Sequence, residues 1–557
     1  MERGCGIFLP IASVSNNSGF GTFSKETYDF IDYLSENNFK YWQILPLTEM
    51  DENKASTCPL SSFAIDPIYI DAEKFMTKEE LEFFKMSSTD SFELFREKKN
   101  ELLKYLFDKL YFETNLDKFI QDNQDWVYDY AVFKCLKDEL KCPYSDFPDC
   151  YKNIDSGETI SFIKTHSEEL VYYIFLQYVA LKQWKELKKY ASSKGVKIIS
   201  SASIFSNANG ADAYANKNEF LMENGKIVDF NNYYGELEIK NQSIESLKSS
   251  PKNATYEPQN MPSLAMFNGH QAKQTKFAFL TKKFKWLSKL YDFILIENAT
   301  EFNRFFACPK LALSNEHKGT VIVNSSLEKA RAQNPNLKIY NISNYNSELK
   351  SNTQNLTQKN SEENATNYAE EFFEILKENK IKFVLEIYLE KSSQENDFCE
   401  SVESTNKKTQ NLSKNDEISG KKAQKSDFYV TKIMQFAFTN NLAKENLPSE
   451  FLKNTVAYLE TQKQNKFSDF LEDENVKSKV CAYLSLPQDS SNETITKMAM
   501  ENLLSSDANV VILSSQDIFE NYSDFESAGF YDFRLKKNFK EEPFVKYLKE
   551  LIKNKNR

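Results

Sequence analysis

Two glutamates stand where short apolar runs end, and a pair of carboxylates so placed has the chemistry to cleave or transfer a glycosidic bond. Glu297 follows the run 293–296, and Glu386 follows the run 383–385. A strand that carries one acidic group at its C-terminal end is how a parallel α/β barrel presents catalytic residues. In a retaining glycosidase the nucleophile and the acid/base are two carboxyl groups about 5–5.5 Å apart. Glu297 and Glu386 are therefore candidates for these two roles.

Each candidate also has a structural interpretation. Strand-end carboxylates can hydrogen-bond or ion-pair at a solvated barrel mouth without any catalysis. Trp42, Tyr214 and Tyr458 could stack on a sugar, or they could pack in the core or in loops. Asp212 could hold a loop in place or contact a ligand.

The elements that must position these residues follow a repeated pattern of an amphipathic helix and then a short apolar strand. Helices are predicted over 24–37, 171–190, 277–287, 368–375 and 495–503, and strands over 7–14, 39–47, 196–199, 292–296, 381–385, 454–458 and 510–513. Gly195 suits a left-handed end of the second helix. Because strands alternate with helices and no glycine-rich phosphate loop occurs, we predict a closed (β/α)8 TIM barrel rather than a doubly wound nucleotide-binding sheet.

The length of 557 residues exceeds what one barrel needs, so the remainder must lie in helical insertions. Helical patterning over 94–140 predicts an inserted helical subdomain at about 72–165 of a single barrel that spans 1–557. Residues 344–364 and 392–425 are rich in Ser, Asn, Lys and Glu and poor in apolar residues. We predict that both are disordered loops.

Composition excludes several classes of function. The net charge of −11 and pI near 5.3 argue against a nucleic-acid partner. Eight cysteines without CxxC spacing and three isolated histidines indicate neither a zinc site nor a disulfide framework. No run of about 20 apolar residues occurs, and the stretch 7–14 contains Pro10 and lacks a cationic leader. We expect a cytoplasmic protein without metal, cofactor or membrane contact.

A series of short fragments runs in one order along nearly the whole chain. They are Arg-Gly-Cys-Gly-Ile-Phe-Leu-Pro at 3–10 with Gly-Phe-Gly at 19–21, Tyr-Trp-Gln-Ile-Leu-Pro-Leu at 41–47, Ser-Ser-Phe-Ala-Ile-Asp-Pro at 61–67, Gly-Ala-Asp-Ala-Tyr-Ala-Asn at 210–216, Met-Gln-Phe-Ala-Phe at 434–438, Asn-Thr-Val-Ala-Tyr at 454–458 and Gln-Asp at 516–517. This series resembles the 4-α-glucanotransferases, the amylomaltases of glycoside hydrolase family 77. The resemblance implies a barrel that acts on α-1,4-glucan (maltodextrin) without a cofactor.

The residues that the resemblance assigns to catalysis depart from the family. Its Arg-Ile-Asp-His-Phe-Arg-Gly-Phe, with Asp as nucleophile, becomes Leu-Ile-Glu-Asn-Ala-Thr-Glu-Phe at 295–302, so Glu297 stands for the Asp and both arginines and the histidine are absent. The acid/base Glu of Ala-Glu-Asp-Leu-Gly is kept as Glu386. The transition-state-stabilising Asp of Thr-Gly-Thr-His-Asp-Asn-Asp becomes Lys463.

The resemblance also marks four positions for substrate binding. Asp212 and Tyr214 lie in the segment similar to Ser-Ala-Asp-Val-Trp-Ala-Asn. Ser201 lies in the segment that replaces Gly-Asp-x-Pro-Ile-Tyr, and Thr57 in the one that replaces Ser-Pro-Tyr.

These departures predict weak catalysis. Glu297 is one methylene longer than Asp, and a shift of about an ångström can cost roughly 10²-fold in a positioned site. Lys463 would oppose the positive charge of the transition state, where losing one preorganised group costs on the order of 10²–10³-fold. Leu295 removes a supporting guanidinium.

Three functions follow. The first is an eroded family member that binds glucan or modulates an active relative, with little or no transfer. The second is a working 4-α-glucanotransferase that uses Glu297 as nucleophile and Glu386 as acid/base. The third is a structural or interaction protein that binds no sugar. The expected partner is α-1,4-glucan or a maltooligosaccharide. The sequence is compatible with a homo- or hetero-oligomer. It also does not decide whether Glu460 replaces the stabilising carboxylate that is lost at Lys463.

Overall fold

The computed structural model describes most of the chain. The described residues are 1–14, 16, 20–49, 58–84, 92–223, 225–230, 263–307, 368–386, 428–439, 444–460, 466–519, 535 and 543–557. Lys463, Thr57 and the predicted loops 344–364 and 392–425 lie outside them.

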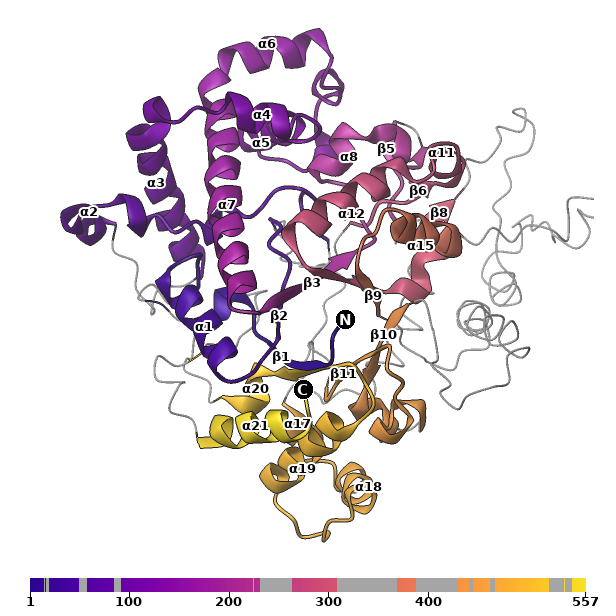
Figure 1. Ribbon diagram of the computed structural model, residues 1–557. Helices are drawn as coiled ribbons and strands as arrows, with labels where there is room; N and C mark the ends of the chain where they lie inside the picture. Colours follow the sequence, from indigo (N-terminus) through magenta and orange to yellow (C-terminus); the bar gives the residue numbers. More distant parts are fainter. Residues whose placement is uncertain are drawn as a thin grey trace, which may run out of the picture.

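Eight parallel strands close into a barrel in the centre of the molecule (Figure 1). In order around the barrel they are β1 Gly4–Phe8, β12 Val510–Ser514, β11 Thr455–Tyr458, β10 Tyr429–Ile433, β9 Phe383–Leu385, β7 Phe293–Glu297, β3 Lys197–Ser203 and β2 Tyr41–Ile44, which returns to β1. The predicted (β/α)8 TIM barrel is confirmed. Four two-residue strands form two separate small sheets: β4 Met222–Glu223 with β5 Lys226–Ile227, and β6 Phe267–Asn268 with β8 Phe306–Ala307.

The barrel interior is a packed core rather than a channel. Side chains alternate along each strand between the lumen and the surrounding helices. The lumen cluster comprises Phe8, Tyr41, Ile199, Phe293, Leu295, Val384, Ile433, Val456, Tyr458, Val510 and Ile512. Gly6 also belongs to this layer, and a Cβ added there would lie 2.6 Å from Tyr41. At Gly4, two residues earlier on β1, an added Cβ would lie 2.9 Å from the Tyr41 ring, so glycine at both positions leaves room for Tyr41.

Amphipathic helices precede several strands and bury their apolar faces against them. They are α1 Lys25–Glu36 before β2, α7 Ser167–Ser193 before β3, α12 Ala278–Leu290 before β7, α15 Tyr368–Glu378 before β9 and α19 Asn492–Ser505 before β12. Each helix falls where the apolar spacing predicts one. Gly195 follows α7 with φ +78°, the left-handed conformation expected of it.

Further helices occupy the connections. Between β2 and β3 they are α2 Lys78–Phe83, α3 Phe92–Leu110, α4 Asp117–Asp122, α5 Val127–Leu140 and α6 Gly157–Thr165, which gather with α7 on one side of the barrel (Figure 1). Elsewhere they are α8 Ala211–Ala215, α11 Gly269–Gln274, α17 Phe467–Phe470, α18 Glu474–Leu484, α20 Ser515–Ile518 and α21 Pro543–Asn554. That the helices of 72–165 form a subdomain of their own stays a prediction.

Two strands differ from the sequence prediction. The apolar stretch 7–14 predicts one strand, but β1 ends at Phe8 and a 3-10 turn covers Ile11–Ser13. Pro10 fixes its own φ and lacks an amide donor, so the ladder cannot continue through it. The apolar patterns also do not predict β10, because polar residues interrupt its five positions. Every helix among the described residues is too short or too polar to span a lipid bilayer.

Candidate active site at the barrel mouth

Glu297 and Glu386 lie at the same level on neighbouring strands. The parallel register of β7 and β9 pairs Ile296 with Leu385, so the next residues along, Glu297 and Glu386, stand side by side. The Glu386 amide donates to the Ile296 carbonyl at 2.9 Å, which continues the ladder. Because the backbones of neighbouring strands are about 4.8 Å apart, the two side chains begin at a spacing from which a pair of carboxyl groups about 5–5.5 Å apart can form. The fold thus brings together the two carboxylates that the sequence singles out.

Both glutamates belong to the lumen side of their strands. Leu295 and Val384, two residues before them, are members of the lumen cluster, and side chains two apart on a strand share a face. Glu297 is 6% exposed and Glu386 is 7% exposed. The pair therefore sits over the packed lumen, largely screened from bulk water.

Asn298 ties the two strands together immediately after Glu297. It adopts a left-handed conformation with φ 52°, which asparagine tolerates better than most residues. The turn directs its amide toward β9, where it donates to Glu386 Oε2 at 3.2 Å. This bond fixes the orientation of the Glu386 carboxyl group.

The neighbours of Glu297 on its other side are small or apolar. On β3, Ser203 pairs with Glu297 and Ser201 pairs with Leu295. Ser201, a predicted substrate contact, is 2% exposed and faces the lumen one layer below the glutamates. Leu295 lies directly beneath Glu297 on the same face. The described residues thus place a hydrocarbon side chain where the resemblance leads one to expect a guanidinium.

Tyr458 connects β11 to β2 across the lumen, near Glu386. Its hydroxyl donates to Gln43 Oε1 on β2 at 2.8 Å. Burial, followed by the charge of Glu386, raises the pKa of Tyr458 above its ordinary value. Tyr458 therefore stays protonated, and it lies close enough to Glu386 for that carboxylate to raise its pKa.

A second pair of carboxyl groups, Glu460 and Asp517, lies past the ends of β11 and β12. Glu460 continues the lumen face of Val456 and Tyr458 and borders a cavity of about 10 Å³ beside Ser514. Such a volume has room for about one water molecule. Burial and then the charge of Asp517 raise the pKa of Glu460, although a hydrogen bond with Ser514 opposes the shift. Burial also raises the pKa of Asp517, whose Oδ1 accepts from the Phe467 amide at 3.0 Å.

Several polar atoms around the mouth have no hydrogen-bond partner among the described residues. These buried atoms are Glu297 Oε2, Glu460 Oε2, Asp517 Oδ2, Gln43 Nε2 and Gln435 Oε1. A buried polar group left without a partner costs about 1–3 kcal/mol. Their concentration at the C-terminal ends of the strands is the pattern expected of a site that receives a polar ligand.

Asp212 bonds to the loop after β2, and Tyr214 packs against helix α5 and the residues that follow it. Both carboxylate oxygens of Asp212 accept from the Ser62 amide at 3.1 Å. The Tyr214 ring packs against Phe133 and Tyr144, with centroids 5.8 and 5.6 Å away. These contacts hold the loop and the helix together, and direct sugar contacts by either residue stay predictions.

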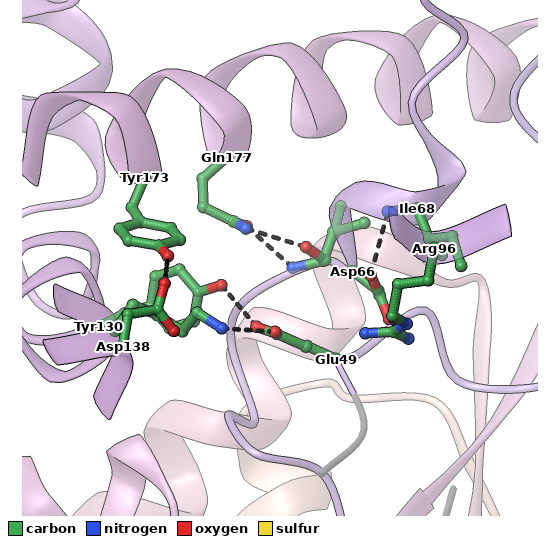
Figure 2. A network of polar contacts seen from close by, with 10 residues as sticks. Glu49, Asp66, Ile68, Arg96, Tyr130, Asp138, Tyr173 and Gln177 are labelled. Carbon is green, nitrogen blue, oxygen red and sulfur yellow. Dashed lines mark hydrogen bonds and ion pairs between the residues drawn. The ribbon is translucent and has the colours of Figure 1, made fainter. Parts of the chain in front are cut away.

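A buried ionic network holds the segment between β2 and α2 against the helices (Figure 2). Glu49 accepts from the Tyr130 hydroxyl at 2.7 Å and from Lys134 Nζ at 2.8 Å. Burial raises the pKa of Glu49, but the charge and hydrogen bond of Lys134 outweigh it and the net shift is downward. Arg96 pairs with Asp66 at 3.2 Å. This network anchors both ends of the connection that carries residues 50–57.

The amide groups of the same segment are held by two glutamines of α7. Gln177 donates to the Ile65 carbonyl and accepts from the Ile65 amide, both at 2.9 Å. Gln183 does the same with Asp71, both at 2.8 Å. Gln177 and Gln183 are six residues apart on α7, as are Ile65 and Asp71 in the loop. The helix therefore holds the loop at two points by backbone hydrogen bonds.

Sequence reasoning missed parts of the mouth and could not place others. Gln43 and Gln435 belong to two of the family-like fragments, and their position at or just after a strand end is the signal that marks them as mouth residues. Lys463 and Thr57 lie outside the described residues, and their roles stay predictions. Within the described residues, no group of three or more His, Cys, Asp or Glu side chains is arranged to hold a metal ion.

Comparison with known proteins gives one consistent family. The sequence profile of the 4-alpha-glucanotransferases, glycoside hydrolase family 77, matches residues 9–528. The 4-alpha-glucanotransferase of Clostridium butyricum is 28% identical over 314 residues, which cover 54% of this chain and 61% of that enzyme. The one from Aquifex aeolicus is 23% identical over 314 residues, covering 55% and 61%. The alignments thus span about three fifths of these relatives.

Solved structures show the same fold over a longer stretch. The amylomaltase from Streptococcus agalactiae in complex with acarbose has a TM-score of 0.70 at 19% identity and covers 100% of both chains. The amylomaltase from Corynebacterium glutamicum has a TM-score of 0.57 at 11% identity, covering 100% of this chain and 75% of that one. At these identities the likeness establishes the architecture.

Proposed function

Since the chain belongs to the 4-alpha-glucanotransferase family, glycoside hydrolase family 77, we propose that it binds α-1,4-glucan at the barrel mouth with little or no transfer. The observation that carries this proposal is the setting of Glu297. Its Oε2 has no hydrogen-bond partner among the described residues, and Leu295 lies beneath it. A nucleophile needs a fixed position and a stabilised charge, and the described residues give Oε2 no hydrogen-bond donor.

Access to the pair supports the same proposal. Glu297 and Glu386 are each less than a tenth exposed, so a glucan chain reaches them only when side chains at the mouth move. The unpartnered oxygens and amides there still favour a ligand with many hydroxyl groups, because each hydroxyl can donate and accept. Binding without efficient turnover accounts for both features.

The second candidate, a working transferase, is favoured by the register of β7 and β9. Glu297 would attack the anomeric carbon while Glu386 protonates the departing glycosidic oxygen, giving a covalent glycosyl-enzyme and a shortened glucan. The 4-hydroxyl of an acceptor sugar would then attack that carbon, release Glu297 and return its proton to Glu386. This sequence restores both carboxyl groups and needs no cofactor.

Incubation with maltotriose separates the two candidates. The first predicts no glucose or longer maltodextrin above the level of Glu386→Gln. Release of both products by the wild type, abolished in Glu386→Gln, would establish the second candidate instead.

The reverse experiment restores the family residues. We expect Leu295→Arg combined with Glu297→Asp to raise transfer by roughly 10²-fold, because both changes support the nucleophile. Leu295→Met is the matched control, since it keeps an apolar side chain of similar volume, and it should leave the rate unchanged. An inactive double variant that is folded by circular dichroism would place the defect elsewhere in the site.

The third possibility, a protein that binds no sugar, is tested by calorimetric titration with maltoheptaose. The proposal predicts saturable heat that weakens in Glu297→Gln. Absence of heat across millimolar sugar would leave only a structural or interaction role.

A further inference from the structure

A cavity of about 580 Å³ lies outside the barrel, between α12, the end of α15 and the turn that joins α4 to α5. Its volume is in the range of small-ligand sites, roughly 300–1,000 Å³. It is lined by neither of the two glutamates nor by any residue of the lumen cluster. It is therefore separate from the mouth and has no part in the chemistry described above.

Three aromatic rings form one side of this cavity. Trp126 lies 5.1 Å from Trp286 and stacks on Phe63 at 6.2 Å, measured between ring centroids. Lys282 Nζ stands 5.3 Å from the Phe63 centroid and Lys289 Nζ 5.6 Å from that of Trp286. Lys282 Nζ also donates to the Asp125 carbonyl at 2.6 Å. Lysine side chains are long and flexible, so a ligand that lies on the rings must displace Lys289 and break this bond of Lys282.

Two buried polar atoms of the cavity wall have no hydrogen-bond partner among the described residues. They are Trp126 Nε1 and Thr281 Oγ1. By contrast, the Trp286 indole nitrogen donates to the Phe63 carbonyl at 2.9 Å. Because both atoms are almost fully buried and the rings are less than a tenth exposed, a ligand reaches them only when the side chains that cover them move.

The charge around the cavity is nearly balanced. Four lysines (276, 282, 285 and 289) and three carboxylates (Asp122, Asp125 and Glu378) line it, which leaves a formal charge of +1. A phosphate or polyphosphate ligand would call for a clear excess of cations. Interspersed donors and acceptors around aromatic rings suit a neutral ligand that carries many hydroxyl groups.

We propose that the cavity formed by Trp126, Trp286 and Thr281 is a second saccharide-binding site, separate from the glutamate pair. An oligosaccharide lies against the indole rings, a hydroxyl accepts from Trp126 Nε1, and another pairs with Thr281. That the saccharide is an α-1,4-glucan rests on the proposed function of the chain.

Tryptophan fluorescence reads this site directly. The chain has four tryptophans; Trp42 and Trp184 are 0% exposed in the main core, and Trp126 and Trp286 both line the cavity. Titration with maltoheptaose should give a saturable fluorescence change in the wild type. The same change should persist in Glu297→Gln and Glu386→Gln, since neither residue contacts the cavity.

Two threonines of the cavity provide a matched pair. Thr281→Val removes an unpartnered hydroxyl at constant shape and should weaken maltoheptaose binding about tenfold, the effect of losing one good hydrogen bond. Thr275 also lines the cavity, but its hydroxyl already donates to the Gln271 carbonyl at 2.9 Å. Thr275→Val should therefore leave the affinity unchanged. Thermal midpoints and near-ultraviolet circular dichroism check that both variants fold.

Three outcomes decide between the sites. A fluorescence change that Thr281→Val weakens and Thr275→Val does not supports the second site, even if calorimetry finds no binding at the mouth. Calorimetric binding that Glu297→Gln weakens, without any fluorescence change, overturns the second site and leaves the proposed function intact. Equal effects of the two threonine variants also overturn it.

Discussion

Two buried clusters of charged side chains lie in this molecule, and they differ in whether their atoms are paired. In the network of Figure 2, Glu49 receives bonds from Tyr130 and Lys134, and Arg96 pairs with Asp66. At the barrel mouth, each of Glu297, Glu460 and Asp517 keeps an oxygen without a partner among the described residues. The first cluster is complete without a ligand and holds a loop. The second is incomplete, as a binding site is before its ligand arrives.

Glu49 and Glu460 also differ in their pKa shifts, although burial raises the pKa of Asp66 in the first cluster despite the charge of Arg96. Lys134 lowers the pKa of Glu49 despite burial, so this carboxylate stays charged and paired. Burial and Asp517 raise the pKa of Glu460, where no cation appears among the causes of the shift. Burial alone therefore does not identify a functional carboxyl group in this chain. The carboxyl groups at the mouth differ because each is buried and keeps one oxygen without a hydrogen-bond partner among the described residues.

The largest expected effect comes from breaking the paired cluster. Lys134→Met leaves Glu49 buried with no ion-pair partner, and removing one member of a buried ion pair costs about 3–5 kcal/mol. Urea denaturation should show this loss in the free energy of unfolding. A loss below about 1 kcal/mol would mean that the Lys134 ion pair contributes little to stability. The proposed difference between the paired network and the mouth would then be wrong.

An effect that is smaller for each pH unit is expected from the pH dependence of stability at the mouth. Because the folded-state pKa of Glu460 is raised, the folded protein keeps a proton that the unfolded chain releases above the ordinary carboxyl pKa. Stability is therefore fully present below that ordinary value and falls as pH rises toward the raised one, by up to about 1.4 kcal/mol per pH unit.

Replacing Glu460 by Gln should flatten this slope, since the amide cannot ionise. The matched control is Glu445→Gln, at an exposed glutamate, which should keep the slope of the wild type. Unfolding by urea at several pH values from 4 upward measures all three proteins. An unchanged slope in Glu460→Gln would show that its carboxyl group is compensated after all.

The smallest effect is expected at the surface. Lys497 pairs with Glu493 at 2.5 Å, but the two side chains are 40% and 77% exposed. Exposed pairs contribute roughly 0–1 kcal/mol, so Lys497→Met should change the free energy of unfolding by less than about 1 kcal/mol. A loss as large as that of Lys134→Met would mean that burial does not set the strength of these pairs.

The sequence was sufficient for most of the fold because its signals are local. Apolar residues at a spacing of three and four predict α1, α7, α12, α15 and α19, and short apolar runs predict seven of the eight barrel strands. The apolar pattern does not predict β10, because polar residues interrupt this strand and its burial comes from neighbouring strands. Apolar character alone predicts a strand over 7–14, whereas β1 ends at Phe8 because Pro10 breaks the ladder.

For the site, the sequence by itself determined which carboxyl groups stand at strand ends, since Glu297 and Glu386 each follow an apolar run. It also determined that Leu295 and Lys463 replace the residues that the family resemblance led us to expect. Only the tertiary structure decided that the two glutamates share a register, that the Asn298 amide reaches Glu386, and that Glu49 meets Lys134 across 85 residues. Pairing and register depend on closure of the whole barrel, which joins segments far apart in the chain, and no local pattern encodes that distance.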